Sequence, residues 1–380
     1  MPTVHDVICV GGGVIGLLTA RELRLRGASV CVVDRSDFGL ESSWAGAGIV
    51  PPPGEGPRAS PLEHLREESF NAFPVLSREI RDATAIDIGF RRSGGMELAE
   101  SAAEANELAE LSDLWRDLKI QFQVLDRQEL QRVEPSLSGD LRAAYHVPEM
   151  CQVRNPRFMK GLRRDLELRG ATLLPREQVT RFLLEGSRVS GVELASGTRL
   201  VARDVVLAAG AWSSSLLEGL GIQLPVRPVQ GQIVAFQTEP GRVTHVIMLG
   251  KRYFVPRDDG LLLVGSTEED VGFVKQVTES GLAELRAFAY RWFPFLRETV
   301  VKASWAGLRP GNDRDYPIVC RVPGYTHLWL GTGHFRQGIQ LGPGSARLLA
   351  DWITEQASFA GPDDFGLGTP LKATRVPFRS

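Results

Sequence analysis

The stretch that decides the fold is VICVGGGVIGLLTARELRLRGASVCVVD, residues 7–34. It opens with an apolar, β-branched run and continues through the spacing G-x-G-x-x-G at Gly11, Gly13 and Gly16. A helical pattern follows, and a second apolar run then ends at Asp34. Strand, glycine turn, helix, strand and acid in this order predict a βαβ unit that binds a dinucleotide.

Each part of this unit has a physical task. The glycines allow a tight turn, close approach of the backbone to a diphosphate, and close packing of the helix on the strand. The helix N-terminus offers free N–H groups and the positive end of its dipole to the diphosphate. Asp34 is placed to accept hydrogen bonds from an adenosine ribose, and its charge disfavours a 2′-phosphate. A glycine turn without a ligand explains neither the third glycine nor this acid.

Length and composition limit the class of protein. A chain of 380 residues exceeds the ~250–300 residues that usually share one core, so we expect two domains. With 24% charged residues and a formal net charge of −2, nothing indicates binding to nucleic acid or an acidic membrane. The four cysteines have no paired spacing, which predicts a reducing compartment, no disulfide framework and no metal site.

No signal peptide is visible, and no apolar run approaches the ~18 residues of a membrane-spanning helix. We therefore expect a cytoplasmic protein with no integral membrane segment and a small-molecule substrate. The sequence leaves open whether the chain forms a homo-oligomer.

Apolar periodicity predicts the remaining elements. Helices are expected at residues 61–85 (kinked or divided at Pro74), 101–119, 127–133, 155–170 (capped by Asn155), 213–220, 280–293 and about 343–353. Strands are expected at residues 86–99, 141–147, 246–249, 252–255, 260–265 and 302–308, with several short ones between 171 and 207.

The chain thus visits the dinucleotide sheet several times, with a second, mostly antiparallel sheet inserted between visits. We predict a fold that combines α/β and α+β parts, a Rossmann-like domain interleaved with a substrate domain. That interleaving suits a flavoprotein better than a nicotinamide dehydrogenase with two successive domains. The expected cofactor domain comprises residues 1–85, 140–215 and 310–360, the substrate domain residues 86–139 and 216–309, and a loosely held tail residues 361–380.

Further stretches carry a more specific signal. They are GGGVIG (11–16), SSWAGAGI (42–49), IDIGFRRSGG (86–95), VVLAAGAWS (205–213), PVRPVQGQ (225–232), YFVPRDDGLLLVGST (253–267), WAGLRPGNDRDYPIVC (305–320) and GHFRQGI (333–339). In this order, and over nearly the whole chain, they resemble the FAD-dependent D-amino-acid oxidase family. Within it they resemble the glycine oxidases of the thiamine pathway.

The resemblance implies an oxidase for glycine, sarcosine or a small D-amino acid. Hydride passes from Cα to flavin N5, the imine is hydrolysed to a 2-oxo acid and ammonia, and O2 is reduced to H2O2. Such an enzyme must hold a carboxylate, and arginine is its planar, bidentate donor. Arg309 matches the family's carboxylate-binding arginine, Tyr253 the tyrosine that assists it, and Arg336 a second active-site arginine. On pattern alone, Arg309 fits a surface ion pair and Tyr253 fits half-buried packing.

The same resemblance implies non-covalent FAD. Residues 312–316 hold no cysteine or histidine where related sarcosine oxidases attach their flavin, and HFRQG here departs from the usual HFRNG. A helix after Gly338 is expected to aim its N-terminus at the flavin. The expected FAD-binding residues are Gly11, Gly13, Val14, Ile15, Gly16, Asp34, Arg35, Ser42, Ser43, Ala47, Gly48, Ile49, Val179, Gly210, His334, Phe335, Arg336, Gln337, Gly338 and Ile339.

Three alternatives remain open at this point. The physiological amine is undetermined. The electron acceptor is a quinone or another carrier if the protein is a dehydrogenase of the same fold. A flavin-binding subunit without its own chemistry is a further reading, which the presence of both Arg309 and Tyr253 disfavours.

Overall fold

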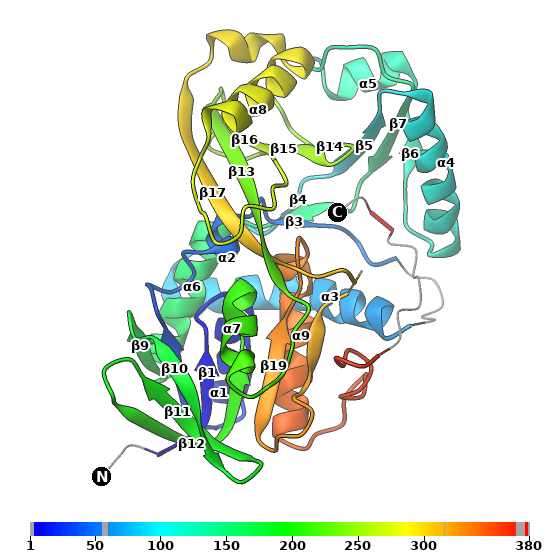
Figure 1. Cartoon of the computed structure of the whole chain (residues 1–380). Helices are drawn as coiled ribbons and strands as arrows, with labels where there is room; N and C mark the ends of the chain where they lie inside the picture. The colour runs from blue at the N-terminus through cyan, green and yellow to red at the C-terminus, as the bar shows by residue number, and fades with distance from the viewer. Residues whose placement is uncertain (1–3, 55–59, 315, 370–376, 379–380) are drawn as a thin grey trace.

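The computed structural model describes residues 4–54, 60–314, 316–369 and 377–378. Part of the proline-rich stretch after Ile49 (residues 55–59) and most of the end of the predicted tail therefore lie outside the described residues. In the described part of the chain, the strands form two eight-stranded sheets and a small three-stranded one. Figure 1 shows one large sheet in the lower half and the other in the upper half.

The first sheet has a parallel centre. Its strands are β1 (Val4–Val10), β2 (Val30–Asp34), β9 (Thr172–Pro175), β10 (Val179–Glu185), β11 (Arg188–Leu194), β12 (Arg199–Leu207), β18 (Ile318–Arg321) and β19 (Leu328–Thr332). The parallel order is β9-β2-β1-β12-β19, while β10, β11 and β18 add antiparallel pairs. Because residues 7–10 of β1 and 30–33 of β2 are buried on both faces, they read as continuous apolar runs.

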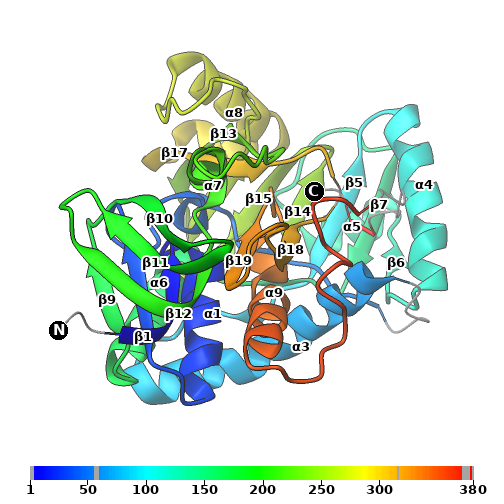
Figure 2. The same ribbon diagram turned by 60° about the horizontal axis from the view of Figure 1, so that its bottom comes forward.

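Helices cover one face of this sheet. They are α1 (Val14–Leu25), α3 (Pro61–Thr84), α6 (Asn155–Leu168) and α9 (Gly338–Ile353). Alternate residues of a strand point to opposite faces, so Val7 and Cys9 join the core under these helices. Ile8 and Val10 join the core on the other face, beneath the β10–β12 strands and α7 (Ser213–Glu218). Figure 2 shows α1 and α9, from opposite ends of the chain, lying side by side.

The second sheet has the order β17-β13-β16-β15-β14-β5-β7-β6, and its only parallel pair among the described strands is β5 with β14. Its strands are β5 (Gly95–Ala99), β6 (Gln123–Val124), β7 (Ala143–Val147), β13 (Arg227–Gln237), β14 (Val246–Leu249), β15 (Arg252–Pro256), β16 (Leu261–Gly265) and β17 (Val301–Gly311). Its two faces are covered by α8 (Glu279–Trp292) and α4 (Ala102–Asp117).

Small elements lie between and beside the large sheets. They are α2 (Ser42–Ala45), β3 (Ile49–Val50), β4 (Arg91–Arg92), α5 (Arg127–Val133), β8 (Cys151–Gln152), η1 (Gly210–Trp212) and η2 (Pro294–Glu298). Strands β3, β8 and β4 form the three-stranded sheet. The predicted second, mostly antiparallel sheet is thus present, and the helix predicted at residues 127–133 has those bounds.

Pro74 does not divide helix α3, which runs through it as one element with its apolar face buried along most of its length. Two other local predictions are wrong. Helix α9 begins at Gly338, five residues before the predicted start, and carries Pro343 inside it. Asn155 is the first residue of α6 and not its N-cap, which is Arg154; the Asn155 side-chain amide donates to the Ser43 carbonyl (2.8 Å).

The described part of the expected tail is also packed more firmly than predicted. Phe365 is buried, and its backbone bridges to Val319 in β18. Phe378 is buried too, with its ring stacked on Trp115 at 5.5 Å between centroids. Aromatic burial of this kind outweighs the lack of periodicity in the segment.

The close packing of α1 on the β1 turn yields a stability prediction. A Cβ at Gly16 would overlap the Gly11 carbonyl oxygen, which belongs to the backbone and cannot rotate away. We expect Gly16→Ala to lower the free energy of unfolding of the FAD-free protein by about 1–3 kcal/mol, measured in urea.

Gly219→Ala is the matched control, because its Cβ would meet only the Leu216 carbonyl at an ordinary 3.5 Å. Its effect is expected within about 0.5 kcal/mol of the wild type. Equal stability of the two variants would contradict the packing role of Gly16.

Candidate active site

A cavity of about 460 Å³ opens between the two large sheets, at the carboxyl ends of β1, β2, β12 and β19. This volume and this place are typical of cofactor sites in open parallel sheets. The predicted residues in its described lining are Gly11, Gly13, Val14, Ile15, Asp34, Arg35, Ser42, Ser43, Ala47, Gly48, Ile49, Val179, Gly210, Tyr253, Arg309, His334, Phe335, Arg336, Gly338 and Ile339.

Two predicted residues are absent from the described lining. Gly16 packs against the Gly11 carbonyl, so it shapes the turn and not the cavity surface. Gln337 precedes α9 and is likewise not part of the lining. Trp212, which was not among the predicted site residues, also lines the cavity, and the Arg35 guanidinium lies 3.7 Å from its ring centroid.

The turn between β1 and α1 is built to receive an anion. Gly11 has a φ of +110°, which only glycine adopts readily. The Asp34 carboxylate is held in place because it accepts from the Gly12 N–H (2.7 Å) and the Ser36 N–H (2.8 Å). The N-terminus of α1, described in full, has no acidic residue in its first turn and no side-chain cap from Gly13.

Several of the described helices satisfy their N-termini with a side-chain cap. α3, α4 and α5 each carry a complete capping box. The N-terminus of α1 has no such cap and faces the cavity through Val14 and Ile15, where the Val14 N–H donates to Ser43 Oγ (2.9 Å). The positive dipole end of this helix suits an anion such as a diphosphate.

The loop at residues 41–49 forms one wall of the cavity. Three side chains hold this loop in place through hydrogen bonds to its backbone carbonyls. The Asn155 amide donates to Ser43. The Trp305 indole N–H donates to Ala45 (2.9 Å), and the Arg257 guanidinium donates to Ala47 (2.7 Å). Asn155 lies on α6, whereas Trp305 and Arg257 come from the second sheet, so both halves of the molecule position this wall.

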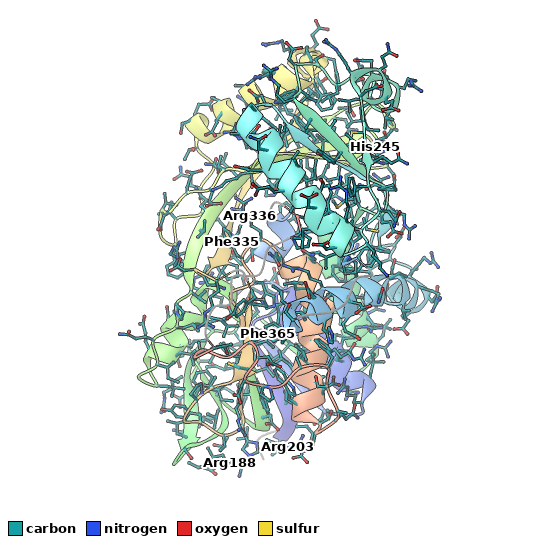
Figure 3. All side chains as sticks on the ribbon, turned by 90° about the vertical axis from the view of Figure 1, so that its right-hand side faces the viewer. Arg188, Arg203, His245, Phe335, Arg336 and Phe365 are labelled. Carbon is teal, nitrogen blue, oxygen red and sulfur yellow. The ribbon has the colours of Figure 1, made fainter. Side chains whose placement is uncertain are left out.

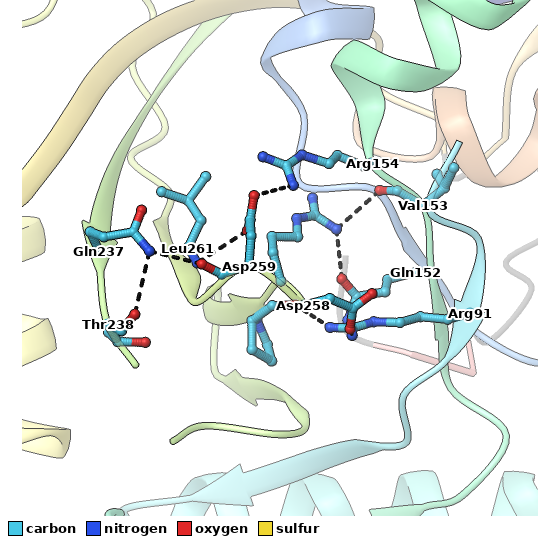
Figure 4. A network of polar contacts seen from close by, with 11 residues as sticks. Arg91, Gln152, Val153, Arg154, Gln237, Thr238, Asp258, Asp259 and Leu261 are labelled. Atoms are coloured by element: carbon cyan, nitrogen blue, oxygen red, sulfur yellow. Dashed lines mark hydrogen bonds and ion pairs between the residues drawn. The ribbon is translucent and has the colours of Figure 1, made fainter. Parts of the chain in front are cut away.

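Arg257 is a buried cation in a polar network. Only 6% of its surface is exposed, and it donates also to Gln152 Oε1 (2.6 Å) and the Val153 carbonyl (3.1 Å). Figure 4 shows Gln152 and Val153 beside the ion pair of Arg154 with Asp259. Burial, aided by the positive charge of Arg154, lowers the pKa of Arg257 to about 9, which leaves it charged at neutral pH.

Arg309 and Tyr253 meet at the other end of the cavity. Arg309 lies on β17 and donates to Ser266 Oγ (2.7 Å); Tyr253 lies on β15 and is 8% exposed. Burial lowers the pKa of Arg309, and the adjacent Tyr253 partly offsets this. The guanidinium remains a cation and a planar donor.

Glycines make the room that these two side chains occupy. Gly231 on β13 lies beside Arg309, and a Cβ there would overlap the guanidinium. Gly265 on β16 pairs with Tyr253, and its Cβ would lie 2.7 Å from the tyrosine hydroxyl oxygen. Sequence reasoning missed both, although each stands in a stretch that resembles the family.

The turn between β19 and α9 brings the second arginine into the cavity. Phe335 has a φ of +48°, a strained value for a bulky residue, and its N–H donates to the Pro310 carbonyl (3.1 Å). Figure 3 shows Phe335 and Arg336 close together near the level at which the two sheets meet. Burial lowers the pKa of the cavity-lining His334 to about 3, so its ring is neutral, with Nε2 3.0 Å from Ser345 Oγ.

Comparison with known proteins agrees with this architecture. Residues 6–352 match the family described as FAD dependent oxidoreductase. The chain belongs to that family. It is 38% identical to the glycine oxidase of Pseudomonas putida over 350 residues, which cover 92% of this chain and 94% of that protein.

Two other relatives agree. The crystal structure of glycine oxidase from Geobacillus kaustophilus superposes with a TM-score of 0.91 at 30% identity, covering 97% of this chain and 100% of that one. The hydrogen cyanide synthase subunit HcnC of Pseudomonas aeruginosa is 32% identical and covers 89% of this chain and 90% of its own.

The predicted Rossmann-like fold with a second, mostly antiparallel sheet is thereby confirmed, and FAD is the cofactor of the family. The anion-binding turn, the fixed Asp34 carboxylate and the glycine-lined wall fit that cofactor. Within the described ranges, no helix combines the length and the apolarity needed to cross a bilayer.

A substitution at Arg257 tests whether this side chain holds the loop at residues 41–49 in place. Arg257→Met removes the donors to Ala47 and Val153 while keeping an apolar stem. We expect about 2–3 kcal/mol loss of stability and about tenfold weaker FAD binding, measured by urea unfolding and by fluorescence titration of the FAD-free protein.

Arg154→Met is the control, because Arg154 pairs with the half-exposed Asp259 and is not among the side chains that hold the carbonyls of residues 41–49. Its loss is expected to cost less than about 1 kcal/mol. Equal losses of FAD affinity in both variants would overturn the role given to Arg257.

Proposed function

We propose that the protein is an FAD-dependent oxidase that deaminates glycine or a similar small amine, such as sarcosine or a small D-amino acid. The observation that carries this proposal is the convergence of Arg309 and Tyr253 on a cavity whose far end is a dinucleotide turn. An arginine guanidinium and a phenol hydroxyl both donate hydrogen bonds to a carboxylate. A substrate whose carboxylate is bound by these two groups has its Cα near the wall at residues 41–49.

The chain's own residues bind and orient the substrate. Arg309 takes the carboxylate in a bidentate arrangement, and Ser266 and Tyr253 fix the plane of its guanidinium. No side-chain base is needed if the amine enters neutral, and orientation then carries most of the catalytic effect. Bound FAD would supply a two-electron acceptor for the Cα hydride, so that glycine, water and O2 would give a 2-oxo acid, ammonia and H2O2.

We assign the cofactor contacts as follows. Gly11, Gly13 and the N-terminus of α1 receive the diphosphate, and Asp34 accepts from the ribose. The wall at residues 41–49 and the N-terminus of α9 flank the flavin ring. We further propose that FAD is bound non-covalently, because none of the described residues in the lining is a cysteine and the Nε2 of the lining residue His334 lies against Ser345 Oγ (3.0 Å).

The division into domains follows from the sheets. We propose that residues 1–85, 148–215 and 310–360 form the FAD-binding domain, and residues 86–147 and 216–309 the substrate domain. We propose 148 for the boundary that the sequence places at 140, and the pairing of β7 with β5 and β6 in the second sheet supports this shift.

A second candidate electron acceptor is a quinone or a protein carrier. The observation that favours it is the group of exposed apolar side chains Val271, Phe273 and Val274, in which the Phe273 ring lies 5.4 Å from that of cavity-lining Trp212. An apolar surface at a cavity mouth suits an apolar acceptor.

The test is anaerobic mixing of the yellow holoenzyme with glycine, sarcosine, D-alanine and D-proline, followed by readmission of air. Bleaching of the flavin absorbance, then rapid reoxidation with peroxide formation, is the expected result. Bleaching without reoxidation would favour the second acceptor. If none of the four amines bleaches the flavin, the assignment to amine oxidation fails.

Arg309→Met is expected to lower kcat/KM for glycine at least about a hundredfold, mainly through KM, because a charge-assisted bidentate contact is lost. Arg227→Met is the control: it lies on the paired strand β13 with a half-exposed side chain facing Asp313. An unchanged KM in Arg309→Met would show that the carboxylate binds elsewhere.

A further inference from the structure

The second arginine of the cavity is not free. Arg336, only 10% exposed, forms an ion pair with Glu268, which follows β16 and is 37% exposed. Lys251 lies on the other side of the same carboxylate, with its Nζ 3.9 Å from Glu268 Oε1, but its side chain is 78% exposed. Water screens Lys251, so the main partner of Glu268 is Arg336.

Glu268 is ionised under ordinary conditions. Burial alone would raise the pKa of its carboxyl, but the hydrogen bond and the charge of Arg336 hold it below its usual value. A carboxylate so engaged is a poor proton acceptor, so it does not serve as a base for the substrate amine. Its effect on the reaction must therefore come through its charge and through the arginine that it occupies.

The side-chain charges at the substrate end of the cavity leave a net positive charge that matches one substrate carboxylate. Arg309 and Arg336 both line the described cavity, and Glu268 cancels the second of these charges. The remaining single positive charge, on Arg309, matches a substrate that carries one carboxylate and a neutral amine. Arg336 Nε is buried without a hydrogen-bond partner among the described residues, so this side chain keeps an unused donor.

We propose that Glu268 is a specificity-determining residue that restricts the enzyme to monocarboxylic amines by occupying Arg336. The inference rests on the proposed function and deepens it. With Glu268 in place, a second carboxylate meets an arginine that is already neutralised and a carboxylate that repels it. With Glu268 neutralised, Arg336 becomes a second anchor, and aminodicarboxylates such as iminodiacetate or D-aspartate become acceptable ligands.

The first test measures binding and needs no turnover. The holoenzyme is titrated with acetate, malonate and succinate, and the perturbation of the flavin absorbance gives each Kd. Wild type is expected to prefer acetate. In Glu268→Gln the preference for a dicarboxylate over acetate is expected to rise about tenfold or more, the scale of a charge-assisted contact.

Matched variants show where the effect arises. Asp270→Asn removes a charge from the same loop, where Asp270 faces Arg227 and is 73% exposed, and is expected to leave the ratio unchanged. Glu268→Asp keeps the charge and should keep the wild-type preference. Glu268→Gln combined with Arg336→Gln is expected to lose the gain, because the second anchor is gone.

Turnover supplies an independent readout. Relative to glycine, kcat/KM for iminodiacetate is expected to rise about tenfold in Glu268→Gln, with the change mainly in KM. An unchanged ligand ratio in Glu268→Gln, or an equal rise in Asp270→Asn, would overturn the proposal. If Glu268→Gln does not give folded holoenzyme, Glu268→Ala is titrated in the same way and judged by the same ratio.

The two proposals fail separately. If wild type oxidises no amine but the dicarboxylate ratio rises in Glu268→Gln, the proposed function is wrong and the charge role of Glu268 stands. If glycine is oxidised and the ratio does not move, the function stands and the role of Glu268 is wrong.

Discussion

The cavity depends on how the backbone carbonyls at residues 43, 45 and 47 are held. Asn155, Trp305 and Arg257 each donate to one of them, and these side chains come from a helix of the first half and from the second sheet. A wall of small residues has few side chains of its own to fix it, so its position is set by these donors. The desolvated guanidinium of Arg257 is retained because its loss would leave several buried carbonyls unpaired.

The substrate end is governed by charge in a confined space. Arg309 is held by Ser266 on a β-sheet, where Gly231 leaves room for its guanidinium. The strained turn at Phe335 sets Arg336 against Glu268, so that one of the two arginines carries unbalanced charge. On our proposal, recognition comes from the number of unpaired cations as much as from the size of the cavity.

The sequence predicts those parts of the molecule whose pattern lies within one short stretch of the chain. The βαβ unit at residues 7–34 is such a part, since its strands, glycines and Asp34 are near neighbours in the chain. Arg309, Tyr253 and Arg336 were predicted from family resemblance, and the fold brings them to one cavity. Arg257, Gly231 and Glu268 escaped prediction because their importance depends on which strand or loop lies opposite, and single-sequence periodicity does not report strand pairing. Helix α9 began earlier than predicted because proline inside a helix was read as its start.

The most direct test of the account is a crystal structure of the holoenzyme with acetate, a monocarboxylate that cannot be oxidised by hydride loss from an amine-bearing carbon. We expect the acetate carboxylate within hydrogen-bonding distance of the Arg309 guanidinium and the Tyr253 hydroxyl, with the Arg336–Glu268 pair intact. Acetate bound instead at Arg336, with Glu268 displaced and no contact between acetate and Arg309, would contradict the proposed carboxylate site.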